Sequence, residues 1–138
     1  ECLDLEITET TLMAQSKAVV DSLLRLRSVG IHISLDDFGT GYSSLNYLQN
    51  LPIDTLKIDR SFINKLAANG EQGKIVETIL MLGDNLGIDV IAEGIETAEQ
   101  LEKLQMIRCP RGQGYYFAKP MEGKALRSLL SSHTGVMK

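Results

Sequence analysis

Two adjacent carboxylates, Asp36 and Asp37, stand at the end of an apolar run and shortly before two glycines, Gly39 and Gly41. Neighbouring anions repel each other, so a cation beside them would stabilise both in the charged form. A divalent metal that prefers oxygen ligands is the simplest such cation, and glycines let the following loop approach a ligand closely. An ordinary polar turn after a strand uses the same residue types. This motif alone therefore leaves a metal site and a turn equally open.

Further charged side chains stand at or just after the ends of other apolar runs. They are Glu6, Lys57, Asp59, Glu93 and Glu96. In folds of alternating strands and helices, the carboxyl ends of parallel strands meet at one edge, and these folds place their chemistry there. A single acid at a strand end is more often a helix cap or a turn residue. Charges at four strand ends instead favour one shared metal or catalytic site.

The elements that would position these side chains alternate along the chain. Apolar runs predict strands over residues 1–8, 31–35, 54–59, 88–92 and 114–118. Helical spacing of apolar residues predicts helices over residues 12–29, 45–51, 61–66, 75–86, 97–104 and 125–130. The fourth helix would bury Ile75, Ile79, Leu82 and Leu86. This alternation predicts an α/β fold of about five parallel strand–helix units, with a frayed tail over residues 131–138.

The composition limits the class of protein. A chain of 138 residues with 43% hydrophobic content has the length of one domain and can bury a core. A net charge of −4 argues against binding a nucleic-acid polymer. Cys2 and Cys109 form no spaced pair, which predicts reduced thiols and a cytoplasmic location. No apolar run has the length of a membrane span and no leader precedes the first strand. Because that strand begins at residue 1, which is not methionine, we expect a piece of a longer chain.

Four segments, in order and spacing, closely resemble the EAL-domain family of cyclic di-GMP phosphodiesterases. They cover residues 36–45 (DDFGTGYSSL), 56–59 (LKID), 92–97 (AEGIET) and 113–117 (QGYYF). Residues 5–9 (LEITE) also resemble the family's preceding acidic strand. The resemblance implies that residues 1–130 are the carboxyl-terminal half of a modified TIM barrel. It also implies that the parent protein binds Mg²⁺ or Mn²⁺ and hydrolyses one phosphodiester bond of cyclic di-GMP, giving linear pGpG.

The resemblance assigns a role to each residue of the acidic cluster. Glu6 and Asp36 would ligate one metal ion, and Asp36 would bridge to a second ion that Asp37 also holds. Glu93 would stand near the metals and the attacking water, as ligand or as base. Lys57 would hydrogen-bond that water or offset charge on the phosphate. Two such ions about 3.5–4 Å apart can activate a shared water and stabilise the attacking and leaving oxygens. Without these neighbours, Lys57 would be a solvated residue at a strand end.

The resemblance also places residues around that cluster. Gln113 would contact the metal-bound water shell or the substrate, although it equally suits a turn. Glu96 would anchor the loop that carries Gly39, Thr40 and Gly41, which the family uses in metal binding and dimer contacts. Glu96 also suits the start of the next helix. The aromatic residues 115–117 fit the core and rim of a strand better than a base-stacking shelf.

Two features of the family do not occur in this sequence. The Glu-Ala-Leu signature and the Asn-bearing strand would both lie upstream, since a TIM barrel takes about 250 residues and eight strands. Residues 108–111 (RCPR) replace the family's usual Gly-Cys-Asp, so the loop before Gln113 is expected to differ in shape. A half-barrel exposes strand edges and an apolar face, which predicts a homodimer. Because ligands of the metal site are missing, we expect little or no turnover by this chain alone.

Three functions remain open from the sequence. The first is a phosphodiesterase, favoured because every metal ligand expected in this span is present. The second is a catalytically degenerate EAL domain that acts as a cyclic di-GMP receptor. The third is a generic α/β domain whose acids are helix caps, which the joint spacing of the motifs disfavours. The parent would further carry an upstream sensory or GGDEF-type domain, and its upstream segments leave room for a membrane tether.

Overall fold

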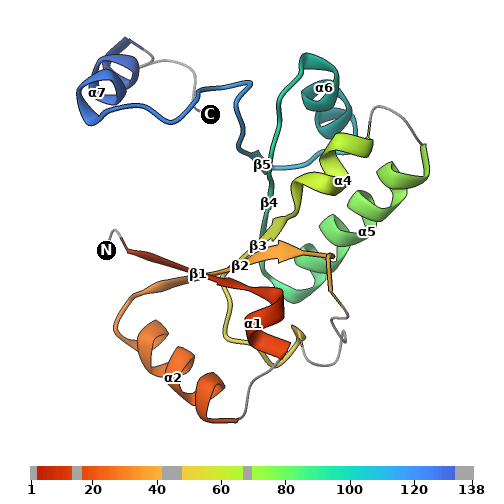
Figure 1. Ribbon diagram of the computed structural model, residues 1–138. Helices are drawn as coiled ribbons and strands as arrows, with labels where there is room; N and C mark the ends of the chain where they lie inside the picture. Colours follow the sequence, from red (N-terminus) through yellow and green to blue (C-terminus); the bar gives the residue numbers. More distant parts are fainter. Residues whose placement is uncertain (1–2, 14–16, 42–47, 67–69, 133–138) are drawn as a thin grey trace.

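One sheet of five parallel strands forms the centre of the computed structural model, which describes residues 3–13, 17–41, 48–66 and 70–132. The strands follow chain order across the sheet (Figure 1). They are β1 (Asp4–Thr8), β2 (His32–Phe38), β3 (Thr55–Ile58), β4 (Asp89–Ala92) and β5 (Arg111–Gly112). All four pairings are parallel, so the predicted α/β fold with five parallel units is confirmed.

The helices surround the sheet in two groups. They are α1 (Glu9–Met13), α2 (Lys17–Ser28), α4 (Arg60–Lys65), α5 (Gly70–Leu86), α6 (Ala98–Met106) and α7 (Gly123–Ser132). The pair α1 and α2 accompanies β1 and β2, whereas α4, α5 and α6 accompany β3 and β4 (Figure 1). The last helix, α7, lies apart from both groups. None of the described helices combines the length and the apolar character that crossing a membrane would require.

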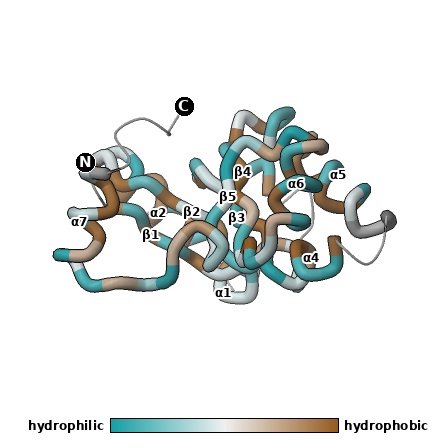
Figure 2. Tube along the Cα trace, turned by 90° about the horizontal axis from the view of Figure 1, so that it is seen from above, coloured by the Kyte–Doolittle hydropathy of each residue, from teal (hydrophilic) through white to brown (hydrophobic). Residues whose placement is uncertain are grey.

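The core lies between β2, β3 and β4 and the helices that cover them, and Ile33 and Leu35 of β2 belong to it. All four residues of β3 are buried, as expected for an inner strand of a parallel sheet with both faces covered. Leu56 and Ile58 on β3 and Val90 on β4 are at most 3% exposed. Figure 2 shows hydrophobic segments gathered around these strands and α4, α5 and α6. This core fixes β3, and with it the one lysine that β3 carries.

The second strand is longer than predicted and includes both acids. The apolar pattern of the sequence predicts that this strand ends at Leu35, but β2 continues through Phe38. Its register against β3 shifts between these two residues, and Asp37 has a φ of 56°. Such an irregularity adds a residue to one strand and re-aims its side chains. The acids are therefore held by the sheet rather than by a free loop.

The fifth strand lies earlier in the chain than predicted. It consists of Arg111–Gly112, and residues 114–118 form a turn instead of a strand. The Tyr116 N–H donates to the Ile95 carbonyl at 2.9 Å, and the Phe117 N–H donates to the Gly114 carbonyl at 3.1 Å. A Cβ at Gly114 would overlap the backbone of Ile95, so only glycine permits this approach. The aromatic residues of the turn are 45–58% exposed, so their prediction as strand core is wrong.

Three helix predictions need adjustment. The segment predicted as one helix over residues 12–29 contains α1 and α2, with residues 14–16 between them outside the described residues. Of the predicted helix over 45–51, residues 45–47 lie outside the described residues, and residues 49–51 of the described part form a turn and a bend. In α5, Val76 and Ile79 are buried whereas Ile75 is 40% exposed, so Ile75 was wrongly placed on the buried side. Helix α7 extends to Ser132, and the rest of the tail that was predicted to fray, residues 133–138, lies outside the described residues.

Gly83 allows α5 to pack closely on β4. A Cβ added at this position would overlap the Val90 side chain and lie 3.0 Å from the Ile88 carbonyl oxygen. We expect Gly83→Ala to lower the free energy of unfolding by about 1–3 kcal/mol, because overpacking outweighs the better helix propensity of alanine. Denaturant titration of the complete parent domain measures the change.

Gly73 offers the matched control in the same helix. A Cβ there meets no atom within 4 Å, so Gly73→Ala should raise the free energy of unfolding by about 0.5–1 kcal/mol. Equal effects of the two substitutions would contradict the close contact at Gly83.

Candidate metal centre

Lys57 lies at the centre of the charged cluster. Its side chain, on β3, is only 6% exposed, and its ammonium Nζ lies 2.7 Å from Glu6 Oε1 and 2.7 Å from Glu93 Oε1. Asp36 Oδ1 is 3.4 Å from the same nitrogen. Glu6 belongs to β1 and Asp36 to β2, while Glu93 directly follows β4. Carboxylates from three segments of the sheet thus surround the buried Lys57 ammonium. The predicted convergence of strand ends is confirmed for Lys57 and these three acids.

Asp36, Asp37 and Glu93 form a group of candidate metal ligands. Each offers one carboxylate oxygen, and these three oxygens all lie within 4.8 Å of one another. Successive side chains of a regular strand point to opposite faces. The positive φ of Asp37 and the register shift beside it change that alternation, so both aspartates reach the same site. The irregular end of β2 therefore has a direct consequence for the chemistry of the site.

The cluster carries more negative than positive charge. Glu6, Asp36, Asp37 and Glu93 face one ammonium, which leaves three negative charges without a cation among these residues. Burial raises the pKa of Glu93, with Asp36 and Glu6 adding to the rise against the opposing pull of Lys57. Burial, then repulsion from Asp36 and Asp59, raises the pKa of Asp37. A divalent cation with oxygen ligands would relieve this repulsion, so the donor set fits Mg²⁺ or Mn²⁺.

The lysine is charged throughout the neutral pH range. Burial alone would lower the pKa of Lys57, but its hydrogen bonds to Glu6 and Glu93 outweigh burial and hold the pKa above its usual range. A protonated ammonium has no free electron pair, so Lys57 acts as a donor of hydrogen bonds and not as a base.

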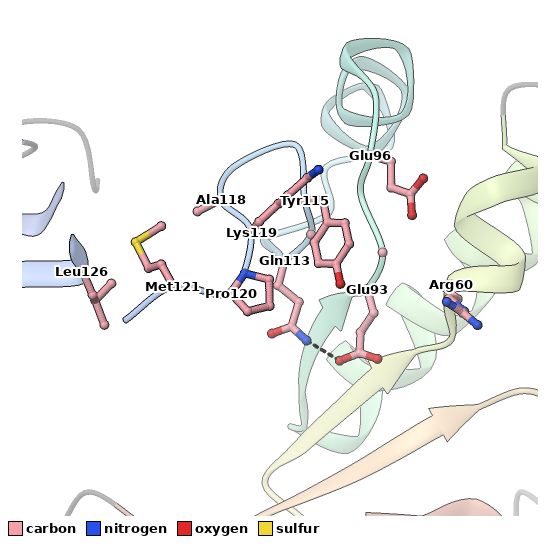
Figure 3. A pocket seen from close by; sticks show the side chains of 12 residues that line it. Arg60, Glu93, Glu96, Gln113, Tyr115, Ala118, Lys119, Pro120, Met121 and Leu126 are labelled. Atoms are coloured by element: carbon pink, nitrogen blue, oxygen red, sulfur yellow. Dashed lines mark hydrogen bonds between the residues drawn. The ribbon is translucent and has the colours of Figure 1, made fainter. Parts of the chain in front are cut away.

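Gln113 belongs to the same site. It follows β5, and its backbone N–H donates to the Ala92 carbonyl at 2.8 Å, which sets it beside the end of β4. Its side-chain Nε2 donates to Glu93 Oε1 (Figure 3). From its sequence position, Gln113 was predicted to contact the metal-bound water or the substrate. In the structure its side chain contacts the Glu93 carboxylate.

Glu9 holds the loop after β2, a role that the sequence did not reveal. Its carboxylate is 2% exposed, and its Oε2 accepts hydrogen bonds from the N–H groups of Gly39 at 2.9 Å and Gly41 at 3.2 Å. A Cβ at Gly41 would lie 2.7 Å from the Glu9 carboxylate, so glycine is needed for this contact. Thr40 Oγ1 closes the turn by donating to the Asp37 carbonyl at 2.9 Å.

Glu96 was also predicted to anchor this loop, and that assignment stays a prediction, because residues 42–47 of the loop lie outside the described residues. In the described part of the chain, the carboxylate that bonds to the loop is Glu9. Glu96 begins the segment before α6, where its backbone N–H donates to Gln100 Oε1 at 2.7 Å. Glu9 stands three residues after Glu6, and that spacing is the signal that could have identified it.

Replacing Glu9 should weaken metal binding without touching a metal ligand. In Glu9→Gln an amide replaces the carboxylate, so two charge-assisted hydrogen bonds weaken and the loop next to Asp37 loses its support. We expect Mn²⁺ affinity of the complete domain to fall about 10- to 100-fold, as measured by calorimetric titration. Glu77→Gln, an exposed residue of α5, is the matched control. A Glu9 variant with the Mn²⁺ affinity of the wild type would argue against this support.

Comparison with known proteins finds one family model and several similar proteins, and they agree with one another. The model of the family described as "EAL domain" matches residues 1–120. The cyclic di-GMP phosphodiesterase NbdA of Pseudomonas aeruginosa is 44% identical over 131 residues, which is 95% of this chain and 17% of NbdA. The solved complex of the MucR phosphodiesterase of the same organism with c-di-GMP is 46% identical, with a TM-score of 0.84, over 90% of this chain and 50% of that chain.

A further solved structure similar to this chain is a metal complex. It is the manganese/cy-diGMP complex of BlrP1 from Klebsiella pneumoniae, which is 33% identical with a TM-score of 0.79, over 85% of this chain and 30% of that chain. The chain thus spans about a fifth of the curated relatives' length and half of the MucR structure. Its five strands form half of a TIM-barrel-like fold. Because the family match covers all five strands and the whole charged cluster, the chain belongs to the EAL domain family.

Proposed function

We propose that the parent protein hydrolyses cyclic di-GMP to linear pGpG at a site with two Mg²⁺ or Mn²⁺ ions, and that this chain supplies most of the side chains at that site. The observation that carries the proposal is the buried Lys57 ammonium among Glu6, Asp36 and Glu93, with Asp37 beside them. The names of the relatives support the substrate, since NbdA and MucR are both called cyclic di-GMP phosphodiesterases. The manganese complex of BlrP1 supports the metal.

Glu6, Asp36 and Asp37 would hold the ions, with Glu93 as a further ligand or as the base. Carboxylate oxygens are the ligands that Mg²⁺ and Mn²⁺ prefer. When bound, such ions would lower the pKa of a bound water and stabilise the attacking and the leaving oxygen. The remaining ligands, including the glutamate of the Glu-Ala-Leu signature, would come from the other half of the domain.

The side chains of this chain account for one of the two proton movements of the reaction. Water would add to phosphorus, the bond from phosphorus to the 3′ oxygen would break, and the 3′ oxygen would take up a proton from solvent, leaving a linear dinucleotide with a 5′ phosphate. Glu93 would accept the proton of the attacking water, because its carboxylate lies with Asp36 and Asp37 in the group of candidate ligands. Lys57 would hydrogen-bond the water or the phosphate oxygen, and Gln113 would orient Glu93.

The setting of the domain is part of the proposal. The loop with Gly39, Thr40 and Gly41 would contribute to a homodimer, so that metal binding and dimer contact share one segment. An upstream sensory or GGDEF-type domain would regulate the site, in line with MucR, which is named as a bifunctional diguanylate cyclase and phosphodiesterase. We expect a cytoplasmic location, where cyclic di-GMP is made and degraded, and little or no turnover by this chain alone.

The test is an assay of the complete parent domain. Purified domain is incubated with cyclic di-GMP and Mn²⁺ or Mg²⁺, and the products are separated by liquid chromatography. We expect conversion to linear pGpG that EDTA abolishes and that Ca²⁺ does not support. Tight binding without turnover in either metal would contradict the proposal and would identify the parent as a cyclic di-GMP receptor.

A further inference from the structure

A groove lies at the opposite end of β4 from the metal centre. Its volume of about 680 Å³ is within the range of small-molecule sites. Asp89, the first residue of β4, lines the groove, whereas Glu93 of the metal centre follows the last residue of the same strand. Because β4 has four residues, the two sites are about 13 Å apart along the strand. None of the described residues that line the groove belongs to the charged cluster around Lys57.

Most of the residues that line the groove are apolar. They come from α5, from the start of β4 and from the connection between α6 and β5, and they are Leu80, Met81, Ile88, Val90 and Pro110. Val90 is 3% exposed and belongs to the core, whereas Met81 is 66% exposed at the surface. A methionine side chain adapts to partners of different shape because its thioether is flexible. The groove is therefore suited to the apolar side chains of a ligand.

Arg108, which also lines the groove, has a backbone conformation that favours glycine. Its φ is 57°. Its N–H donates to the Gln105 carbonyl at 3.0 Å, and the Cys109 N–H donates to the Leu104 carbonyl at 2.9 Å. These two hydrogen bonds form a Schellman motif at the end of α6, in which glycine is preferred because a Cβ is strained in the left-handed region. An arginine at this position lowers stability, and the end of the helix does not need its side chain.

Two charged side chains of the groove are available to a ligand. In the part of the chain that the structure describes, neither the Arg108 guanidinium nor the Asp84 carboxylate forms an ion pair or a side-chain hydrogen bond. Asp89, in contrast, accepts from Arg111 at 2.7 Å. Asp84 belongs to α5 and Arg108 follows α6, so the negative and the positive group come from different walls. A ligand that matches both would carry a cation and an anion on an apolar body.

We propose that the groove binds a short apolar peptide with free termini, about a dipeptide in length. The terminal carboxylate would lie against Arg108, because a planar guanidinium can donate two parallel hydrogen bonds to a carboxylate. The terminal ammonium would lie against Asp84, and the apolar side chains would contact Met81 and its apolar neighbours. A free amino acid carries both charges on one carbon and would reach the two walls less well. Binding would also account for an arginine where glycine would be more stable.

The experiment titrates the complete parent domain with leucyl-leucine and two capped forms of it. N-acetyl-leucyl-leucine lacks the terminal ammonium, and leucyl-leucine amide lacks the terminal carboxylate. We expect calorimetry to give a Kd of about 0.1–1 mM for leucyl-leucine, as is typical of a ligand of this size. Each capped form should bind about 5- to 10-fold more weakly, because one charge-assisted hydrogen-bonded contact is lost. Free leucine should also bind more weakly than leucyl-leucine.

Arg108→Gly separates binding from stability. Glycine relieves the left-handed strain, so the Tm of the domain without peptide should rise by about 1–4 °C. Binding of leucyl-leucine should nevertheless weaken about 5- to 10-fold. Leucyl-leucine and its amide should then bind equally, because the group that distinguishes them is gone. An arginine with a purely structural role would change stability without changing this ratio.

Asp84→Asn is the complementary variant. It should remove the preference for leucyl-leucine over the acetylated form and leave the preference over the amide unchanged. Arg25→Gln, an exposed residue of α2, removes a positive charge away from the groove and should leave every affinity unchanged. All titrations are made without metal or cyclic di-GMP, so their results do not depend on the proposed function.

The outcomes decide the proposal directly. A wild type that does not bind leucyl-leucine would overturn the site. Equal binding of the free and the capped peptides by the wild type would also overturn it, because the termini would then not contact charged groups. The same holds if Arg108→Gly retains the preference over the amide. If circular dichroism shows that Arg108→Gly is unfolded, the argument from strain fails and Asp84→Asn decides the site.

Discussion

Asp36→Asn in the complete parent domain should lower the hydrolysis of cyclic di-GMP about 1,000-fold while leaving the fold intact. Asp36 takes part in both sets of contacts at the site. Its carboxylate lies 3.4 Å from the Lys57 ammonium, and it also belongs with Asp37 and Glu93 to the group of candidate ligands. An amide oxygen carries no charge and is a weaker ligand for Mg²⁺ or Mn²⁺. Metal ions supply several kcal/mol of transition-state stabilisation, and a loss of about 4 kcal/mol corresponds to this decrease.

Steady-state assays in Mn²⁺ measure the loss, and calorimetry with Mn²⁺ measures the accompanying fall in metal affinity. Asp21→Asn, on the exposed side of α2, removes one negative charge far from the cluster and should leave both values unchanged. An Asp36 variant that retains more than about a tenth of wild-type turnover would show that this carboxylate is not a metal ligand.

Lys57→Met should destabilise the metal-free domain by about 2–4 kcal/mol and abolish turnover. Methionine matches the length of the lysine stem, but it leaves Glu6, Asp36 and Glu93 facing one another without the ammonium. Removing one partner from a buried ionic group costs several kcal/mol, and the half-exposed Glu6 reduces this cost through solvent screening. Binding of Mn²⁺ would restore cations to the cluster, so the loss of stability should be much smaller in Mn²⁺ than in EDTA.

Thermal or denaturant unfolding in the two conditions tests this expectation. Turnover should not recover with the metal, because the hydrogen-bond donor to the water or the phosphate is still absent. Lys74→Met on the exposed side of α5 is the control and should change stability by less than about 0.5 kcal/mol. If Lys57→Met loses the same stability with and without Mn²⁺, the metal does not bind among these carboxylates.

The order of strands and the convergence of charges could be predicted from the sequence. Short apolar runs ended by Asp36, Lys57 and Glu93 indicated parallel strands, and parallel strands bring their carboxyl ends together. The sheet order and the distances around Lys57 agree with this argument. Short apolar runs were sufficient here because strands of a parallel sheet that are buried on both faces are largely apolar.

The local detail of the site could not be predicted in the same way. Aspartate is rare in strands, so the apolar pattern ended β2 before Asp36, whereas the register shift carries the strand through Phe38. Aromatic residues favour strands, but the approach of Gly114 to the Ile95 backbone makes a turn of the segment that contains Tyr115. Both features depend on contacts between distant segments, which single-sequence patterns do not contain.

The contact between Glu9 and the loop could not be predicted for a related reason. Glu9 is one of several acids just past a strand, and the sequence gives no measure of which of them bonds to Gly39 and Gly41. The structure identifies Glu9, which is 2% exposed and accepts hydrogen bonds from both glycines.

The order of the strands also determines when the charged cluster can form during folding. Each strand pairs with the one that follows it in the chain, and each parallel pairing must close a crossover connection of a dozen or more residues. The partners of Lys57 closest to its ammonium are Glu6 and Glu93, which belong to β1 and to the segment after β4. The ionic cluster is therefore complete only after all four strands have joined. We expect its contacts to form after the folding transition state, so that Lys57→Met speeds unfolding more than it slows folding.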